Sequence, residues 1–263
     1  MRISIDNNEV DLYTNNRTAE PAKPSVVFVH GAGFDHSVWT LLARHFSRLG
    51  WNAIAVDLPG HGRSSGESIS TIEGMAGWLQ RILETLQLDR IALVGHSMGS
   101  LIALATAASL GNKATHLVLI GSIAPMPVSD PILDATANKP NSAHTMLTSF
   151  SFSKQNLLGG NPNPGMWMIA DSMRRYETEI SAALDIDMRA CNAYTDGLAS
   201  AEKVGCPTLM IHGDADRLTP IRATRPLMQA IPDSKLAIIS GCGHSLMVEA
   251  PNEVLDHMKQ HLL

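Results

Sequence analysis

Two kinds of hydrophobic segment alternate along this chain. Short continuous apolar runs, among them VVFV, IALV, LVLI and TLMI, are separated by longer stretches with apolar residues at helical spacing. Continuous apolar runs are typical of strands that are covered on both faces, as in a parallel sheet flanked by helices. The regular alternation therefore predicts a doubly wound, mostly parallel α/β sheet.

The same pattern places the individual elements. Strands are predicted at Arg2–Ile5, Glu9–Tyr13, Ser25–His30, Ala53–Asp57, Ile91–Gly95, His116–Gly121, Thr208–His212 and Leu236–Ser240. Asn7-Asn8 indicates a hairpin turn between the first two strands. Helices are predicted near Ser37–Leu49, Thr71–Leu86, Met98–Leu110, Ile221–Ile231 and Pro251–Leu262.

The alternation stops between Ala124 and Ala201, where prolines and the loop GGNPNPG interrupt short helical pieces. A structureless connection of this length is improbable in a compact domain, so we expect residues 125–200 to form an inserted helical cap. Residues 1–124 and 201–263 would then form the core. Methionines in the cap either line an adaptable apolar pocket or form the cap's own core; they are Met146, Met166, Met168, Met173 and Met188.

Composition narrows the functional class. The chain has 263 residues, 44% of them hydrophobic and 17% charged, and a formal net charge of −5. This charge gives no basic surface for nucleic acid. No apolar run approaches the roughly 20 residues that span a bilayer, and the first residues lack the apolar segment of a signal peptide. Three cysteines without a C-x-x-C motif indicate a reducing compartment. We therefore expect a cytoplasmic protein that binds neither membranes nor nucleic acid.

A serine lies between a predicted strand and a predicted helix in the segment Gly95-His96-Ser97-Met98-Gly99. At such a sharp turn the serine hydroxyl projects above the carboxyl edge of the sheet, and glycines two residues away on each side let strand and helix approach closely. The helix N-terminus adds partial positive charge for a developing oxyanion. Ser97 is therefore predicted to be a nucleophile.

A serine hydroxyl needs a base, and the base needs an acid that holds its tautomer. The later chain supplies both in loops after predicted strands. Asp214 and Asp216 follow one strand, and His244 follows the next. The order Ser97, Asp, His244 is that of enzymes with a nucleophile elbow, and strands ending at one sheet edge would bring the three residues together.

Five segments, HGAGFDHSVW, DLPGHGRS, GHSMG, GDADRLTP and GCGH, make the chain similar to the α/β-hydrolases. The resemblance covers nearly all of the chain except the cap. Its pattern G-x-x-D-x-x-x-P is matched by Gly213, Asp216 and Pro220, which favours Asp216 over Asp214 as the acid. The family's alternative acid position, one strand earlier, reads Gly121-Ser122-Ile123 here and holds no acid.

The resemblance also reassigns the glycine turn after the Ser25–His30 strand. A dinucleotide-binding turn requires G-x-G-x-x-G, but His36 stands at the third glycine position. His30-Gly31 instead resembles the family's oxyanion loop, which implies that the backbone N–H groups of Ala32 and Met98 form the oxyanion hole. His30 would brace the loop. A nicotinamide-dependent oxidoreductase is disfavoured for the same reason.

The expected substrate is a small-molecule carboxylic ester or lactone, with Phe34, His36 and Leu218 lining its site. His61 is a further candidate for substrate contact. Carbon–carbon bond cleavage and perhydrolysis use the same triad and stay open, as does a non-catalytic binding protein on this fold. No cofactor or metal is expected, since the eleven histidines form neither H-x-H nor H-E-x-x-H. The sequence carries no signal of oligomeric state.

Overall fold

An eight-stranded sheet forms the centre of the protein in its computed structural model, which describes residues 1–160, 167–170, 172–173 and 181–263. The strands lie in the order β1-β2-β4-β3-β5-β6-β7-β8. Their bounds are β1 Arg2–Ile5, β2 Asn8–Tyr13, β3 Ser25–Val29, β4 Asn52–Val56, β5 Ile91–His96, β6 Ala114–Ile120, β7 Thr208–Gly213 and β8 Ser234–Ile239. β2 pairs antiparallel with both β1 and β4, and β3 to β8 are parallel to one another. The predicted doubly wound sheet is confirmed.

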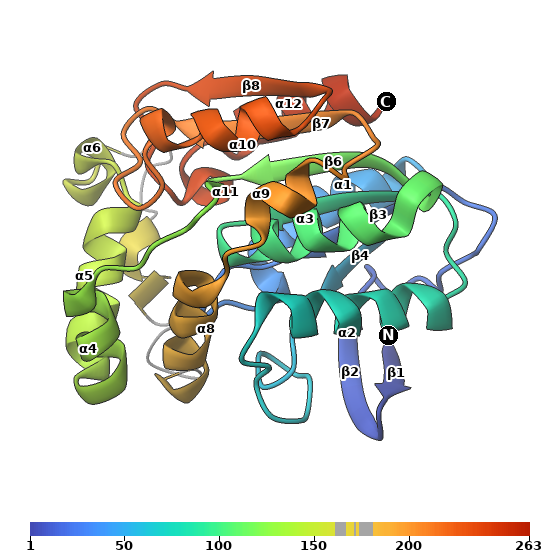
Figure 1. The fold of residues 1–263 in the computed structure, drawn as a ribbon, viewed down its shortest axis with the longest axis horizontal. Coiled ribbons are helices and arrows are strands. Elements are labelled where there is room, and N and C mark those ends of the chain that lie inside the picture. Colours follow the sequence, from blue (N-terminus) through green and yellow to red (C-terminus); the bar gives the residue numbers. More distant parts are fainter. Residues whose placement is uncertain (161–166, 171, 174–180) are drawn as a thin grey trace.

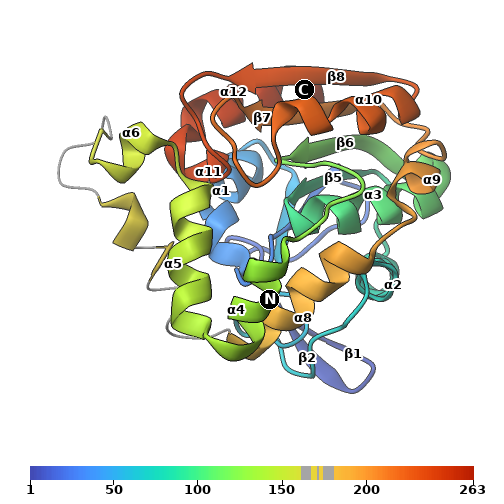
Figure 2. The same ribbon diagram turned by 60° about the vertical axis from the view of Figure 1, so that its left-hand side comes forward.

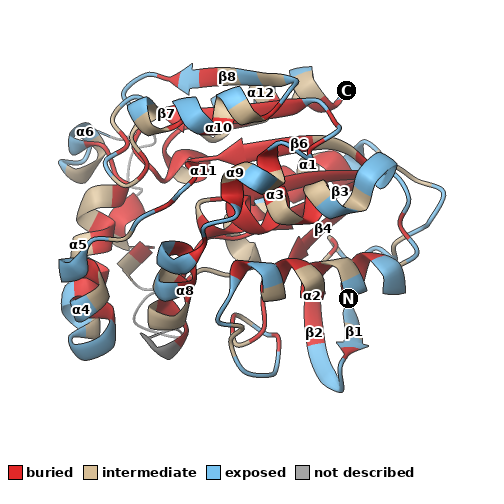
Figure 3. Cartoon of the chain, viewed as in Figure 1, coloured by how far each residue is buried: buried red, intermediate tan, exposed pale blue. Residues whose placement is uncertain are grey.

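Helices cover both faces of this sheet. Alternate side chains of each strand point to opposite faces, and in the central strands both sets are apolar. On β3, Val27 and Val29 belong to one apolar cluster and Val26 and Phe28 to the other. The first cluster includes side chains of α2 (Ile72–Thr85), α3 (Met98–Leu110) and α10 (Arg225–Ala230). The second includes α1 (Thr40–Arg48), α11 (Leu246–Glu249) and α12 (Pro251–Leu262). The central strands are therefore buried on both faces (Figure 3).

Two predicted helices differ from those observed. The segment predicted as Ser37–Leu49 begins with a 3-10 turn, His36–Trp39, and continues as α1. The segment predicted as Ile221–Ile231 is divided into a 3-10 turn, Ile221–Ala223, and the helix α10. Pro226 lies in the first turn of α10, where its missing N–H is tolerated, and this missing N–H prevents the preceding turn from continuing as one α-helix.

Between β6 and β7 the described residues are largely helical. Their helices are α4 Asp130–Asn138, α5 Pro140–Ser151, α6 Lys154–Leu157, α8 Ser181–Ala193 and α9 Gly197–Ala201. We call residues 125–200 the inserted segment. In it, α4 packs against both α5 and α8, beyond the carboxyl ends of the parallel strands (Figures 1 and 2). Met166 lies outside the described residues.

This topology brings the loops with the predicted chemistry to one edge of the sheet. The loops after β3, β5, β7 and β8 all leave from the carboxyl ends of parallel strands, where ligands bind in open α/β sheets. Within the described part of the chain, no helix combines the length and apolar character that crossing a membrane requires.

Candidate active site

Ser97 lies between β5 and α3 in a backbone conformation that is rare for a side chain other than glycine. Its φ is +52° and its ψ is −121°. Such a conformation costs of order 1–3 kcal/mol and persists only where the surroundings enforce it. The Ser97 N–H donates to the Ile120 carbonyl of β6 at 2.9 Å, which fixes the turn against the neighbouring strand.

Two glycines let the strand and helix meet at this turn. A Cβ atom built on Gly95 would lie 2.1 Å from the carbonyl oxygen of Gly99. A Cβ atom on Gly99 would lie 2.2 Å from the carbonyl oxygen of Val29 in β3. Both distances are far below van der Waals contact, so the backbone of the elbow requires glycine at both positions.

His244 and Asp216 form a buried pair beside the elbow. The Nδ1–H of His244 donates to the Asp216 carboxylate at 2.8 Å, which leaves Nε2 of the ring as the basic nitrogen. Burial raises the pKa of Asp216, but the charge of His244 and the hydrogen bond to it outweigh burial and hold this pKa well below its usual range. Asp216 is therefore a carboxylate that fixes the histidine tautomer.

Thr219 completes the surroundings of the Asp216 carboxylate, a role that the sequence reasoning missed. Its hydroxyl donates to Asp216 at 2.7 Å, and its backbone N–H donates to the other carboxylate oxygen at 2.8 Å. Thr219 lies inside the G-x-x-D-x-x-x-P pattern, three residues after the acid. Asp214 is exposed instead and binds Ser240 and Gly241, so the structure pairs His244 with Asp216 rather than Asp214.

Two distances show that His244 lies next to the Ser97 turn. The ring atoms Cε1 and Nδ1 of His244 lie 3.0 Å from a Cβ built on Gly121, directly after the Ile120 carbonyl that binds Ser97. His96, the residue before the serine, donates from Nε2 to the His244 carbonyl at 3.0 Å. Burial and the nearby His244 lower the pKa of His96 to about 3, so its ring is neutral. His96 therefore braces the histidine loop.

The loop after β3 is held by His30, as the resemblance implied. The His30 Nδ1–H donates to the Gly31 carbonyl at 2.9 Å, and its Nε2 accepts the Leu58 N–H at 3.2 Å. Burial, with the nearby His61, lowers the pKa of His30 to about 4. Because a trans peptide points its C=O and N–H in opposite directions, the hydrogen bond to the Gly31 carbonyl restrains the direction of the Ala32 N–H from one side.

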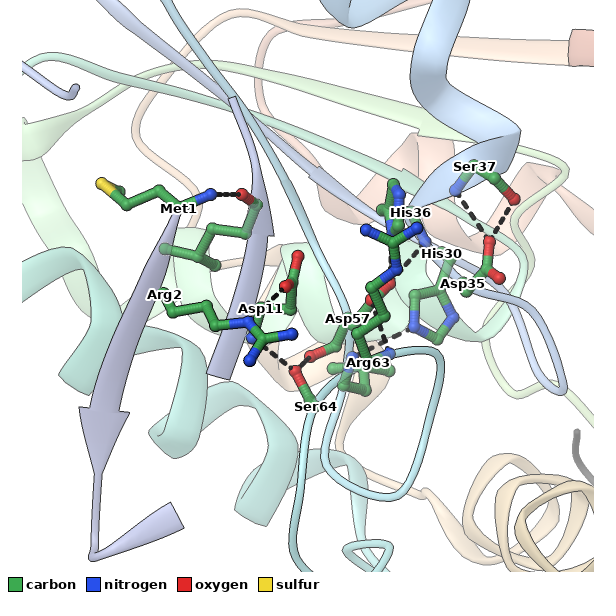
Figure 4. Close-up of polar contacts among 12 residues, drawn as sticks. Met1, Arg2, Asp11, His30, Asp35, His36, Ser37, Asp57, Arg63 and Ser64 are labelled. Atoms are coloured by element: carbon green, nitrogen blue, oxygen red, sulfur yellow. Dashed lines mark hydrogen bonds and ion pairs between the residues drawn. The ribbon is translucent and has the colours of Figure 1, made fainter. Parts of the chain in front are cut away.

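The neighbouring turn is organised by Asp57 (Figure 4). Its carboxylate accepts from the His36 backbone N–H at 2.7 Å, from the His36 ring at 2.8 Å and from the Arg63 N–H at 2.9 Å. Burial lowers the pKa of His36, but Asp57 outweighs burial and raises it overall. His36 thus lies against Asp57 and outside the cavity lining, which does not support the expected substrate contact.

Asp35, His36 and Asp57 are also, in the described ranges, a group whose potential metal-ligand atoms lie within 4.8 Å of one another. The Asp57 carboxylate is already bound to His36 and Arg63, and the Asp35 carboxylate accepts the Ser37 N–H that begins the 3-10 turn. These hydrogen bonds account for the cluster, and we assign no metal to it.

A cavity of about 350 Å³ opens onto Ser97, within the usual size range of ligand pockets. Ala32 and Thr219 are among its lining residues. The inserted segment supplies most of the apolar wall: Met126, Ile132, Leu147, Phe150, Met188 and Cys191. Leu218 lines this cavity, whereas Phe34 lines a separate small cavity with Phe152 and Met168. Of the predicted methionines, Met188 therefore faces the Ser97 cavity, and Met168 and Met173 pack with Phe152.

Comparison with known proteins leads to the same family as the geometry of the site. The sequence profile of the alpha/beta hydrolase family matches residues 26–257, so the chain belongs to this family, and the protein is an enzyme of the α/β-hydrolase class.

Several individual proteins are also similar. The chain is 28% identical over 244 residues to a pimeloyl-[acyl-carrier protein] methyl ester esterase of Aromatoleum aromaticum, covering 88% of this chain and 95% of that protein. It is 26% identical over 261 residues to a 2-hydroxy-6-oxononadienedioate/2-hydroxy-6-oxononatrienedioate hydrolase of Pseudomonas putida, covering 91% and 88%. The enol-lactonase of Burkholderia xenovorans LB400 shares the fold, with a TM-score of 0.85, 19% identity and coverage of 100% and 99%.

The elbow geometry yields a prediction about stability. Gly99→Ala places a methyl group against the Val29 carbonyl, and such overpacking costs about 1–3 kcal/mol or more. Urea denaturation should therefore show a lower unfolding midpoint for this variant.

Gly77→Ala is the matched control, because the nearest atom to a Cβ at Gly77, the Arg81 Nη1, is 3.8 Å away. In this helix interior, alanine should stabilise the protein by about 0.5–1 kcal/mol. Equal midpoints for the two variants would contradict the account of the elbow.

Proposed function

We propose that the protein is a serine hydrolase that cleaves a carboxylic ester or lactone through an acyl-enzyme, with Ser97, His244 and Asp216 as its catalytic triad. The observation that carries this proposal is the opening of an apolar cavity onto a strained serine, beside a histidine whose Nδ1 is held by a buried carboxylate. A binding protein would need neither the strain nor the paired histidine.

The proposed reaction has two halves. His244 Nε2 takes the proton of Ser97, whose oxygen attacks the substrate carbonyl, and then protonates the departing alcohol oxygen. In the second half His244 activates a water molecule, which attacks the acyl-enzyme and releases the acid. Asp216 stabilises the charged imidazole in both halves. For a lactone, ring opening leaves the new hydroxyl group on the acyl chain, and hydrolysis of the acyl-enzyme releases a single hydroxy acid.

The N–H groups of Ala32 and Met98 are proposed as the oxyanion hole. Ala32 lines the cavity together with Ser97, and Met98 is the first residue of α3, where the helix N-terminus adds partial positive charge. Removing one such donor costs about 3–4 kcal/mol of transition-state stabilisation in enzymes of this type.

The inserted segment is proposed to act as a cap that selects the acyl group, because its apolar side chains form most of the cavity wall. A medium-length acyl chain or a lactone ring fits this chemistry. Carbon–carbon bond cleavage is the second candidate reaction, favoured by the similarity to the Pseudomonas putida hydrolase. It would use the same residues.

Arg217 is the charged residue among those lining the cavity. It is exposed, its guanidinium lies 5.0 Å from the centre of the Phe150 ring, and it donates to the Ser149 carbonyl. No carboxylate of the described residues forms an ion pair with it. We propose that it binds an anionic group of the substrate at the cavity rim, and the similarity to a hydrolase named for dioates supports this.

Ser97→Ala should leave folding intact and remove nearly all ester hydrolysis, because no other group supplies the nucleophile. The measurements are turnover of a panel of esters and lactones, and intact mass after treatment with a fluorophosphonate probe. One adduct is expected on the wild type and none on the variant. Substantial turnover by the folded variant would contradict the assignment of Ser97 as the nucleophile.

Arg217→Gln tests the rim charge. The matched substrates are a methyl ester of a linear dicarboxylic acid with its second carboxylate free and the neutral methyl ester of equal length. The variant should lose about threefold to fivefold in kcat/KM on the anionic ester, the range of an exposed ion pair, and keep its rate on the neutral one.

Arg222→Gln is the control for this test, because it removes the same charge from an exposed residue outside the cavity. It should leave both rates unchanged. Equal losses for the two variants, or equal losses on the two esters, would show that Arg217 does not bind the substrate.

A further inference from the structure

Asp187 connects the inserted segment to the loop after β3. It lies in α8, its side chain is fully buried, and one carboxylate oxygen, Oδ2, accepts two hydrogen bonds. The first comes from the backbone N–H of Gly33 at 2.9 Å, and the second from Nε2 of His61 at 2.8 Å. Three segments far apart in the sequence therefore meet at this single oxygen atom.

The hydrogen-bond partners of His61 define its charge. Its Nδ1 lies 3.0 Å from the Pro59 carbonyl, and its Nε2 faces the Asp187 carboxylate. Both partners can only accept hydrogen bonds, so this environment favours the ring with both nitrogens protonated. Burial lowers the pKa of His61, but the charge of Asp187 and the hydrogen bond to it raise it overall. His61 thus balances the buried charge of Asp187.

Packing alone does not account for this arrangement. The second carboxylate oxygen of Asp187, Oδ1, is buried and has no hydrogen-bond partner among the described residues. Leu184 and Cys191, on the same face of α8, are apolar and equally buried. An apolar residue at position 187 would join the helix to the core without burying an ion pair. A buried ion pair often contributes little or nothing to stability. The carboxylate therefore has a role that an apolar side chain cannot fill.

The position of Gly33 indicates that role. Ala32, the proposed oxyanion donor, lies between two peptide units that are each held by a buried side chain. His30 holds the carbonyl of the Gly31–Ala32 peptide, and Asp187 holds the N–H of the Ala32–Gly33 peptide. Gly33 has a φ of +68°, so the chain turns sharply here. Without Asp187, the second peptide would lose its anchor and the Ala32 N–H could rotate out of line.

We propose that Asp187 is a positioning residue for the oxyanion hole: it aligns the Ala32 N–H from the inserted segment, without touching the substrate. Neither Asp187 nor His61 lines the Ser97 cavity. The inserted segment then contributes to the rate of the chemical step as well as to substrate choice. This inference rests on the proposed function, because it assigns Asp187 to a hydrolytic oxyanion hole.

The test compares variants at position 187 by kcat and KM on a neutral ester, with kcat expressed per Ser97 labelled by a fluorophosphonate. Asp187→Ala removes the acceptor for Gly33, and its kcat should fall about 10-fold to 100-fold while KM changes less than about threefold. Asp187→Asn can keep an amide oxygen at the Oδ2 position, where it still accepts the Gly33 N–H and faces His61 Nε2, so its kcat should stay within about threefold of the wild type.

Asp185→Asn is the matched control in the same helix. Asp185 binds Arg189 and Thr136, and it makes no contact with the loop after β3. Its kcat should equal that of the wild type. Asp187→Ser, whose short hydroxyl cannot reach Gly33, replaces the alanine variant if that variant does not fold, and the same fall in kcat is expected.

The outcomes separate the two levels of the proposal. A kcat per labelled serine that is equal in the alanine or serine variant and in Asp185→Asn would overturn the positioning role. A fall of equal size in Asp187→Asn would also overturn it, since the oxygen for Gly33 is still present. A wild type that hydrolyses no ester and takes no label at Ser97 would instead refute the proposed function.

Discussion

The close backbone contact between β5 and α3, which requires glycine at positions 95 and 99, is the constraint on which the rest of the site depends. Strand β5 and helix α3 approach so closely there that a single methyl group would overlap a carbonyl oxygen. This contact forces Ser97 into its positive-φ conformation. A serine held in this way costs stability, and the cost is offset by the apolar core that covers both sides of the sheet. The stability of the whole fold therefore maintains the strained turn that exposes the Ser97 hydroxyl.

Buried polar contacts then align the other loops around that hydroxyl. Neutral His30 and His96 each hold a backbone carbonyl, one in the loop after β3 and one at His244. The low pKa of each ring keeps it uncharged, so that the Asp216–His244 pair meets little competing positive charge. The preorganised dipoles, rather than large motions, are what the proposed chemistry requires.

The inserted segment is tied to this arrangement at more than one point. The Ser151 carbonyl, at the end of α5, accepts the backbone N–H groups of His244 and Ser245. Buried Glu249 accepts N–H groups from Gly243 on one oxygen and from Ser153 on the other, which joins the histidine loop to the start of α6. With the contact of Asp187 to Gly33, both the His244 loop and the loop after β3 are bound to the segment that lines the cavity.

Hydrophobic periodicity predicted the sheet and most helices, because each strand and helix is determined by short-range patterns. The break before α10 is also indicated by Pro226 in the sequence. The partners of buried polar groups were not predictable in this way, since Asp187 and Gly33 are 154 residues apart. An acid at helical spacing from Leu184 and Cys191 was the available signal. His36 was a candidate for substrate contact, but it binds Asp57 and lies outside the lining of the Ser97 cavity.

A nucleophilic Ser97, as we propose, becomes covalently acylated during turnover. The most direct measurement is rapid quenching of the wild type with a slowly hydrolysed activated ester, followed by intact-mass and peptide analysis. We expect a transient mass increase that corresponds to the acyl group, located on Ser97 and decaying at the turnover rate. Turnover of the same ester without any acyl adduct on Ser97 would contradict it.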